Sequence, residues 1–276
     1  MVHGMDVIVT GEPGRWIARR GEEVIGEVTA FARPDGRCLV LFRSCRAEAY
    51  TPLVRAVAGH FPRDLHTEIS ESDAEACETL AESGFVIGRR DHVYTVPTDP
   101  AVTGLAGVTV PVGFELVTAD QVEEDRLREL DDELRQDVPG CDGWRWDRQG
   151  FREQTYGSAA FDPAVYLVAV ERSTGRYAGL VRIWNDPARP RLGLIAAGRP
   201  YRRRGLARGL LAQVFSVLHD RGVPEVAAEA DVTNTASVTL LTSLGARRTG
   251  GSLELVRPGD RRPLGPEHRK RAFPGG

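Results

Sequence analysis

The residues with the clearest chemical meaning lie in GRPYRRRGLARGLLAQVF, residues 198–215. Three arginines precede Gly205, and the apolar spacing that follows predicts an amphipathic helix. The first turn of a helix leaves backbone N–H groups without partners, and the helix dipole favours anions there. Because Gly205 has no side chain and Ala207 has only a methyl group, a phosphate can approach the backbone. The alternative is a solvated basic helix entry, which we expect for at least one of the arginines.

The elements around this stretch must carry it between a strand and a helix. Alternating or continuous apolar residues predict strands over residues 113–120, 165–171, 177–185, 191–197 and 225–231. Apolar residues three and four apart predict a helix around 127–138, and shorter patterns predict helices at 149–156 and 234–244. Gly245 then stands where a helix C-terminus favours a left-handed glycine. With a last strand or strand pair before residue 257, the predicted order is β-α-α-β-β-β-α-β-α-β.

The length of 276 residues suits two domains. Residues 97–113 contain three prolines and three glycines among small residues, which indicates a linker. We therefore predict a first domain over 1–100, a linker over 101–112, a second domain over 113–258 and an irregular basic tail over 259–276.

An internal repeat connects the two predicted domains. Residues 67–97 align without a gap on residues 228–258, so that Gly84 falls on Gly245. The shared pattern is a strand, a short helix, a glycine stop, an arginine pair and a strand. Where the second copy has RRRGLA, the first has RSCRAEAYTP, which contains no glycine. We therefore expect the first domain to be a degenerate copy without the phosphate loop.

RRRGLA and the helix after it resemble the acetyl-CoA loop of the GNAT acetyltransferase superfamily, and NTASVTLLTSLGA resembles that family's asparagine-led helix. The resemblance implies an α/β (α+β) protein with two GNAT-like domains, each a mixed, largely antiparallel sheet flanked by helices. It also implies acetyl-CoA as cosubstrate, bound in the second domain alone. The residues that it implies for cofactor binding are Ala197, Arg202, Arg203, Arg204, Gly205, Leu206, Ala207, Asn234 and Ser237. Asparagine is also a good helix N-cap, and the two roles can coexist.

The sequence departs from the family pattern at the groups that move protons. Leu241 stands where the family often has a tyrosine acid, so this role is either vacant or filled from elsewhere; Thr239, Ser243 and Tyr201 are nearby in sequence. The predicted strand 191–197 contains no acid. Glu229 and Asp231, which share one face of the next strand, are therefore the candidate bases, acting through a water.

The acceptor side is predicted from the loop after the first helix of the second domain. There the resemblance places Asp137, Asp142 and Trp144 against the acceptor. Further acids in the same helix suit a cationic, polar acceptor such as an amino sugar or a polyamine.

Charge and composition exclude several other classes. The formal net charge of −3 favours no nucleic-acid partner. The four cysteines lack zinc-site spacing, so no metal is expected, and they indicate reduced thiols. No membrane segment or signal sequence is recognisable. We thus expect a cytoplasmic N-acetyltransferase, monomeric or homodimeric, that transfers the acetyl group by direct attack of a small amine: an amino sugar, an amine antibiotic or a peptide-like amine. The alternative is a CoA-binding regulatory or sensor module without turnover.

Overall fold

The computed structural model describes residues 6–33, 36–141, 143–187 and 189–259. The chain forms two compact units that interleave along the sequence. The first unit contains Met1–Ile69, Asp73–Gly88 and Glu254–Gly276, and the second contains Ser70–Ser72 and Arg89–Leu253. The predicted tail over 259–276 lies outside the described residues except for Gly259.

The second unit contains the predicted β-α-α-β-β-β-α-β-α-β order, which the structure confirms from residue 113 onward. Short 3-10 helices precede β8 and follow β10. The elements are β7 (Phe114–Thr118), α4 (Glu124–Arg135), α5 (Arg148–Thr155), β8 (Tyr166–Glu171), β9 (Tyr177–Trp184), β10 (Arg191–Ala197), α6 (Leu206–Asp220), β11 (Glu225–Asp231), α7 (Thr235–Ser243) and β12 (Arg247–Arg257).

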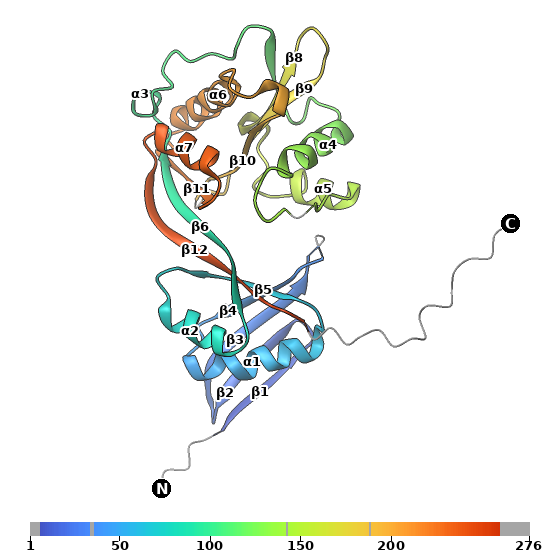
Figure 1. Cartoon of the computed structure of the whole chain (residues 1–276), viewed down its shortest axis with the longest axis vertical. Helices are drawn as coiled ribbons and strands as arrows, with labels where there is room; N and C mark the ends of the chain where they lie inside the picture. Colours follow the sequence, from blue (N-terminus) through green and yellow to red (C-terminus); the bar gives the residue numbers. More distant parts are fainter. Residues whose placement is uncertain (1–5, 34–35, 142, 188, 260–276) are drawn as a thin grey trace, which may run out of the picture. The chain divides into compact units, whose positions relative to one another are not determined.

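The sheet of the second unit has helices on both faces (Figure 1). Its strand order is β6-β11-β10-β9-β8-β7, where β6 is Val86–Pro97, and the pairs are antiparallel except for the parallel pair β10–β11. Buried leucines of α6 and α7 pack with alternate residues of the sheet on one face. Leucines of α4 pack with Phe151 of α5 on the other face. This arrangement confirms the predicted mixed, mostly antiparallel fold.

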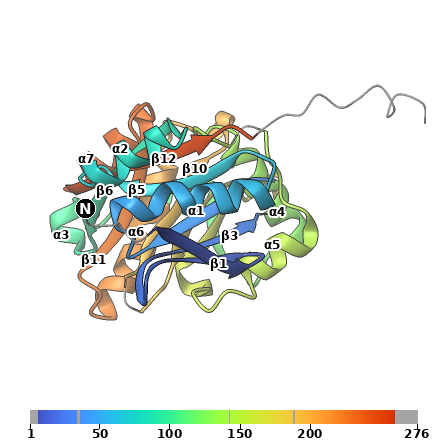
Figure 2. The ribbon, with the colours of Figure 1, turned by 90° about the horizontal axis from the view of Figure 1, so that it is seen from below.

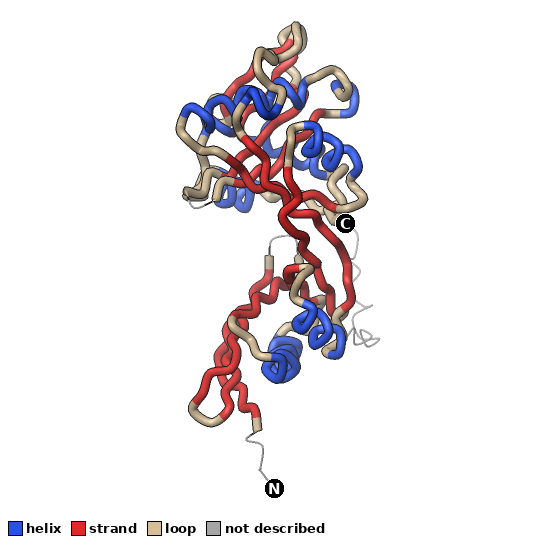
Figure 3. Tube along the Cα trace, turned by 90° about the vertical axis from the view of Figure 1, so that its left-hand side faces the viewer, coloured by secondary structure: helices blue, strands red, loops and turns tan. Residues whose placement is uncertain are grey.

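The first unit has the same strand and helix pattern with fewer helices. Its elements are β1 (Val7–Glu12), β2 (Arg15–Arg20), β3 (Glu23–Ala32), β4 (Cys38–Arg43), α1 (Ala47–His60), β5 (Leu65–Ser70) and α2 (Ala74–Glu82). Helix α1 packs across β1, β2 and β3 (Figure 2). Both helices lie on one side of these strands (Figure 3).

The repeat places β5, α2 and β6 on β11, α7 and β12. Both copies end their helix with a left-handed glycine, at φ 90° for Gly84 and 74° for Gly245. The neighbour of β11, however, is β6 rather than β12, and the neighbour of β5 is β12 rather than β6. The last strands of the two copies have therefore exchanged neighbours. Residues 89–97 of β6 belong to the second unit, and residues 254–257 of β12 belong to the first. The predicted boundaries at residues 100 and 112 follow the repeat rather than these packing units, and they stay a prediction.

Part of the predicted linker is structured within the second unit. Residues Pro100–Thr103 form the short helix α3. The segment after it packs on α6, where a Cβ at Gly209 would meet the Val110 Cα at 2.9 Å. Arg208 also donates to the Gly104 carbonyl at 2.7 Å. Glycine at position 209 is thus required for this close approach.

The described residues contain neither a membrane-spanning helix nor a metal site. Among those residues, no helix is long and apolar enough to span a membrane, and no group of His, Cys, Asp and Glu side chains is arranged to hold a metal ion. The cysteines Cys38, Cys45, Cys77 and Cys141 are all free thiols.

Candidate functional site

The sheet of the second unit opens between β10 and β11. These parallel strands pair at two positions, Arg191 with Ala227 and Leu192 with Ala228. Beyond them β10 stays paired with β9 as far as Ala197, while β11 runs on to Asp231. The strands therefore diverge after Leu192, and an extended ligand can pair with the exposed edge of β10.

The loop at the end of β10 shapes the start of α6. Residues 198–205 contain a 3-10 turn and two left-handed residues, Arg203 at φ 62° and Gly205 at φ 83°. Gly205 is the N-cap of α6, and Leu206 anchors the first turn in the core at 1% exposure. Among the backbone hydrogen bonds of the described chain, none has a donor N–H from residues 203–208. These N–H groups are the ones that an anion at the helix start would accept from.

The three arginines of this loop have different partners. Arg202 donates to the Ala197 carbonyl at 3.0 Å and forms an ion pair with Asp137. The Arg204 guanidinium lies 5.3 Å from the Phe114 ring centre and 6.0 Å from that of Tyr201. Arg203 is exposed and has no polar partner among the described residues. Arg203 is therefore the arginine of this loop that matches the expected solvated helix entry.

Asn234 is the N-cap of α7. Its Oδ1 accepts a hydrogen bond from the Ser237 backbone N–H at 3.1 Å. The cap leaves the Asn234 amide nitrogen available, so this geometry is compatible with the cofactor role that the resemblance implies. Leu241 on the same helix is 3% exposed and packs in the core with α6.

The candidate bases Glu229 and Asp231 lie on the face of β11 away from α6. Their neighbours Ala228 and Ala230 pack in the core under α6 and α7, so the alternate residues face the side of α4 and α5. Glu229 is half-exposed and forms an ion pair with Arg191 at 3.3 Å. Asp231 accepts from the backbone N–H of Thr233 at 2.7 Å and from its hydroxyl, so it also shapes the turn into α7.

Sequence reasoning missed Asp91, a third acid on this face. Asp91 of β6 is the register partner of Asp231, and it is 7% exposed. Burial raises the pKa of Asp91, and the charges of Asp231 and Glu229 raise it further, while Arg89 at 2.9 Å lowers it. The exchange of strands brings Asp91 here, and no local pattern in the sequence signals that exchange.

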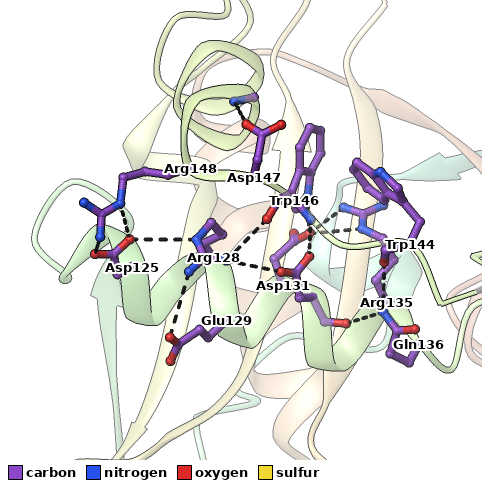
Figure 4. Close-up of polar contacts among 12 residues, drawn as sticks. Asp125, Arg128, Glu129, Asp131, Arg135, Gln136, Trp144, Trp146, Asp147 and Arg148 are labelled. Carbon is purple, nitrogen blue, oxygen red and sulfur yellow. Dashed lines mark hydrogen bonds and ion pairs between the residues drawn. The ribbon is translucent and has the colours of Figure 1, made fainter. Parts of the chain in front are cut away.

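The acidic side chains of α4 form ion pairs and hydrogen bonds with other residues of the protein (Figure 4). Asp131 is fully buried and binds Arg182 at 3.1 Å and Arg135 at 2.6 Å. It also accepts from the Trp146 indole N–H at 3.0 Å. Burial alone would raise the pKa of Asp131, but the two guanidinium charges outweigh it and hold the pKa below its usual value. Neither Asp131 nor the buried Asp132 therefore faces an acceptor as free negative charge.

The predicted acceptor residues are placed as follows. Asp137 pairs with Arg199 at 2.9 Å and with Arg202, and these bonds hold the pKa of Asp137 below its usual value. Trp144 is partly exposed and packs edge-on against Trp146 at 4.5 Å. Asp142 lies outside the described residues. The structure thus connects Asp137 to the phosphate loop, and the acceptor roles of these residues stay a prediction.

Tyr201 lies close to the loop but its hydroxyl is engaged. It donates to Glu171 Oε2 at 3.3 Å, and the ring packs edge-on against Phe114 at 5.7 Å. Burial and the Glu171 charge raise the pKa of Tyr201. The structure thus gives no support to Tyr201 as a substitute for the family tyrosine.

The comparisons with known proteins agree with this geometry. Residues 127–246 match the acetyltransferase (GNAT) family, and this range contains the loop, the splayed strands and α7. The chain has the fold of GNAT proteins over about nine-tenths of its length. A GCN5-related N-acetyltransferase from Sphaerobacter thermophilus has 19% identity and a TM-score of 0.68, with 90% of this chain and 82% of that one covered. No curated protein is significantly similar in sequence.

Two further structures share the fold. A tandem GNAT protein from the clavulanic acid biosynthesis pathway, solved without acetyl-CoA, has 18% identity and a TM-score of 0.65, with 90% of this chain and 84% of that one covered. A glucosamine N-acetyltransferase region of a fungal multi-domain β-N-acetylglucosaminidase has 12% identity and a TM-score of 0.61, with 87% of this chain and 32% of that one covered. The predicted resemblance to tandem GNAT proteins is thereby confirmed.

Proposed function

We propose that the protein is an acetyl-CoA-dependent N-acetyltransferase that acts on a small amine by direct attack. The observation that carries this proposal is the combination of splayed strands β10 and β11 with the backbone N–H groups of residues 203–208, which donate to no backbone carbonyl of the described chain. A pyrophosphate fits the helix start, and an extended pantetheine arm fits the open edge of β10. Asn234 would bind the same arm through its amide nitrogen.

The reaction that fits this site is the transfer of an acetyl group from sulfur to nitrogen. The amine lone pair attacks the thioester carbonyl, a C–N bond forms, the C–S bond breaks, and CoA leaves as a thiolate. A base must take the proton of the amine. We assign this role to Glu229 or Asp231 through a water, because both side chains lie on the face of β11 opposite α6. The thiolate takes its proton from solvent, since the side chain at position 241 is an apolar leucine.

We infer that the first unit does not bind acetyl-CoA. Its strands β4 and β5 also pair at two positions, Cys38 with Leu65 and Leu39 with His66. The connection from β4 to α1 spans residues 44–46, whereas the connection from β10 to α6 spans residues 198–205. The short connection has no glycine and begins α1 at Ala47, so it has no room for a pyrophosphate loop.

Two experiments test this proposal: the first measures the binding of acetyl-CoA, and the second measures acetyl transfer to amines. A ligand that binds only the folded state raises its melting temperature, so acetyl-CoA should stabilise the protein in a thermal-shift experiment. Release of the CoA thiol with amines such as amino sugars, polyamines and peptide-like amines should then show turnover. The absence of turnover with any of these amines at every pH from about 6 to about 9, a range that brackets a neutral operating pH, would exclude the catalytic proposal.

The alternative is a CoA-binding sensor without turnover. It is favoured by one observation, the buried apolar Leu241 at the position of the family's acid. In that case acetyl-CoA and CoA would both raise the melting temperature, and no amine would be consumed. The thiol-release experiment separates the two functions.

A further inference from the structure

Arg89 of β6 contacts a segment that lies far from it in the sequence. Its Nη2 forms an ion pair with Asp91 at 2.9 Å, and its Nη1 donates to the Pro139 carbonyl at 3.4 Å. The Gly140 backbone lies against the same guanidinium, so that a Cβ added there would stand 3.0 Å from Nη1. Because a guanidinium presents five donors in a planar fork, it binds the carboxylate and the carbonyl together. Arg89 therefore joins β6 to the segment that follows α4.

The same segment is bound at its other end to the end of β10. Asp137 pairs with Arg199 at 2.9 Å and with Arg202, and Arg202 donates to the Ala197 carbonyl at 3.0 Å. We call residues 137–140 the crossing segment. In the sheet, β11 lies between β10 and β6. The crossing segment therefore runs from the β10 side of the opening, past β11, to the β6 side.

The two attachments lie at a similar level along the strands. Continuing the β10–β11 register by five residues past its last pair sets Ala197 roughly level with Thr233. Continuing the β6–β11 register by two residues past the pair of Asp91 and Asp231 sets Arg89 level with Thr233 as well. Two strand spacings are about 10 Å, and three residues of extended chain reach about as far. With an arginine side chain at each end, the crossing segment is long enough to cross the wide end of the opening.

The candidate bases lie on the same face of the sheet as this attachment. Side chains two residues apart on a strand share a face, so Arg89 and Asp91 project to the side of Glu229 and Asp231. Asp231 is two residues and Glu229 four residues inside the level of Arg89, which is roughly 7 Å and 13 Å along the strand. An acceptor that extends from either acid toward the wide end of the opening therefore meets the crossing segment.

We propose that Arg89 is a specificity-determining residue: by holding the crossing segment over the wide end between β10 and β11, it limits the acceptor to compact amines. The inference rests on the proposed function, because it concerns the size of the amine that reaches Glu229 or Asp231. Arg89 touches no reacting group and acts through the position of the crossing segment. Since β6 belongs to the degenerate copy of the repeat, that copy contributes to acceptor choice although it lacks a phosphate loop.

The variants that test the proposal remove Arg89 without leaving a buried charge. Arg89→Gln alone would deprive the buried Asp91 of its counter-charge, which destabilises a protein by itself. The double variant Arg89→Gln/Asp91→Asn is therefore compared with Asp91→Asn, so that the two proteins differ only at position 89. Arg90→Gln is the matched control, because Arg90 is the exposed neighbour on β6 and projects to the other face. Thermal unfolding confirms that each variant is folded.

Hydrogen exchange followed by NMR measures the attachment and needs no substrate. The Cys141 N–H donates to the Val138 carbonyl at 3.2 Å, which closes a turn over residues 138–141. Without Arg89 this turn opens more often, so the N–H should exchange at least about tenfold faster in the double variant than in Asp91→Asn. Arg90→Gln should exchange at the wild-type rate. Equal exchange in the double variant and Asp91→Asn would overturn the proposal.

Turnover tests the size limit with pairs of amines that share one reacting group. Each amine that the wild-type protein acetylates is paired with a longer derivative, such as glycinamide with tetraglycinamide. We expect kcat/KM to be at least about tenfold lower for the longer amine in wild type, Asp91→Asn and Arg90→Gln. In the double variant the difference should shrink to about threefold or less, at an unchanged Kd for acetyl-CoA.

The outcomes separate this inference from the proposed function. Equal kcat/KM for short and long amines in the wild-type protein, or an unchanged preference in the double variant, would overturn the role of Arg89 and leave the acetyltransferase standing. Turnover of no amine at all would overturn the acetyltransferase, and the size limit with it, whatever the rate of hydrogen exchange.

Discussion

Asp91 of β6 stands directly opposite Asp231 of β11, as its partner in the antiparallel register. The first residue comes from the degenerate copy and the second from the copy that contains the phosphate loop. Two like charges at opposed positions destabilise a strand pair. Protonation of Asp91 removes this repulsion, so the stability of the folded protein should depend on pH.

Asp91→Asn should flatten the fall of stability with rising pH. Because the folded-state pKa of Asp91 is raised, the native protein binds this proton more tightly than the unfolded chain. The stability contributed by the protonated form is complete below the unfolded value of 3.8 and is lost as the pH rises through the raised pKa. Urea unfolding from about pH 4 to about pH 8 measures the slope. An identical slope in wild type and variant would show that Asp91 keeps its ordinary pKa.

Glu229→Gln should lower kcat with little change in the affinity for acetyl-CoA. If Glu229 takes the amine proton through a water, its loss removes about a hundredfold or more of the rate. Asp231→Asn keeps the carbonyl oxygen that caps Thr233, so it serves as the matched comparison. The larger fall in kcat identifies which of the two acids is the base.

Gly205→Val should abolish acetyl-CoA binding. Valine at φ 83° is strained, and its side chain would stand in front of the N–H groups of the first turn of α6. Gly222→Val is the matched control, because Gly222 has a φ of 76° at the other end of the same helix, with no atom within 4 Å of a new Cβ. Calorimetric titration with acetyl-CoA should show binding to the control and none to Gly205→Val. Equal affinities would overturn the phosphate-binding loop.

Local patterns were sufficient to predict the elements from residue 113 onward. Strands 191–197 and 225–231 agree with β10 and β11 at both ends, because each is bounded by proline, glycine or a turn and contains short apolar runs. Gly245 was predictable as a helix end because a left-handed backbone at that place favours glycine. Signals of this kind depend on neighbouring residues and need no knowledge of the tertiary fold.

The exchange of β6 and β12 was not predictable in the same way. The two strands occupy equivalent places in the repeat and have similar sequence patterns, so the sequence of either strand is compatible with pairing to β11. Which of the two strands pairs with β11 depends on contacts between residues far apart in the sequence. Asp91 was missed for this reason, and Arg182 was missed because an arginine inside an apolar strand gives no sign of the Asp131 that neutralises it.

Asp131→Asn should destabilise the protein by about 3–5 kcal/mol, because it leaves the buried Arg182 without its counter-charge. The folded-state pKa of Asp131 is depressed, so its contribution is present above the unfolded pKa and is lost as the pH falls through the folded value. Asp125→Asn is the control on the same helix, since Asp125 forms partly exposed pairs with Arg148 and Arg128. Such pairs contribute about 1 kcal/mol or less. Urea unfolding near neutral pH should separate the two variants clearly.

Asp137→Asn should change the affinity for acetyl-CoA rather than the KM for the amine. The Asp137 carboxylate binds Arg199 and Arg202, and Arg202 also holds the Ala197 carbonyl at the end of β10. Loss of the charge releases both arginines and alters the approach to the phosphate loop. Stability should change by about 1 kcal/mol or less, because the pairs are exposed. Calorimetric titration with acetyl-CoA and initial rates at varied amine concentration distinguish the two roles. A higher KM for the amine at unchanged acetyl-CoA affinity would instead place Asp137 against the acceptor.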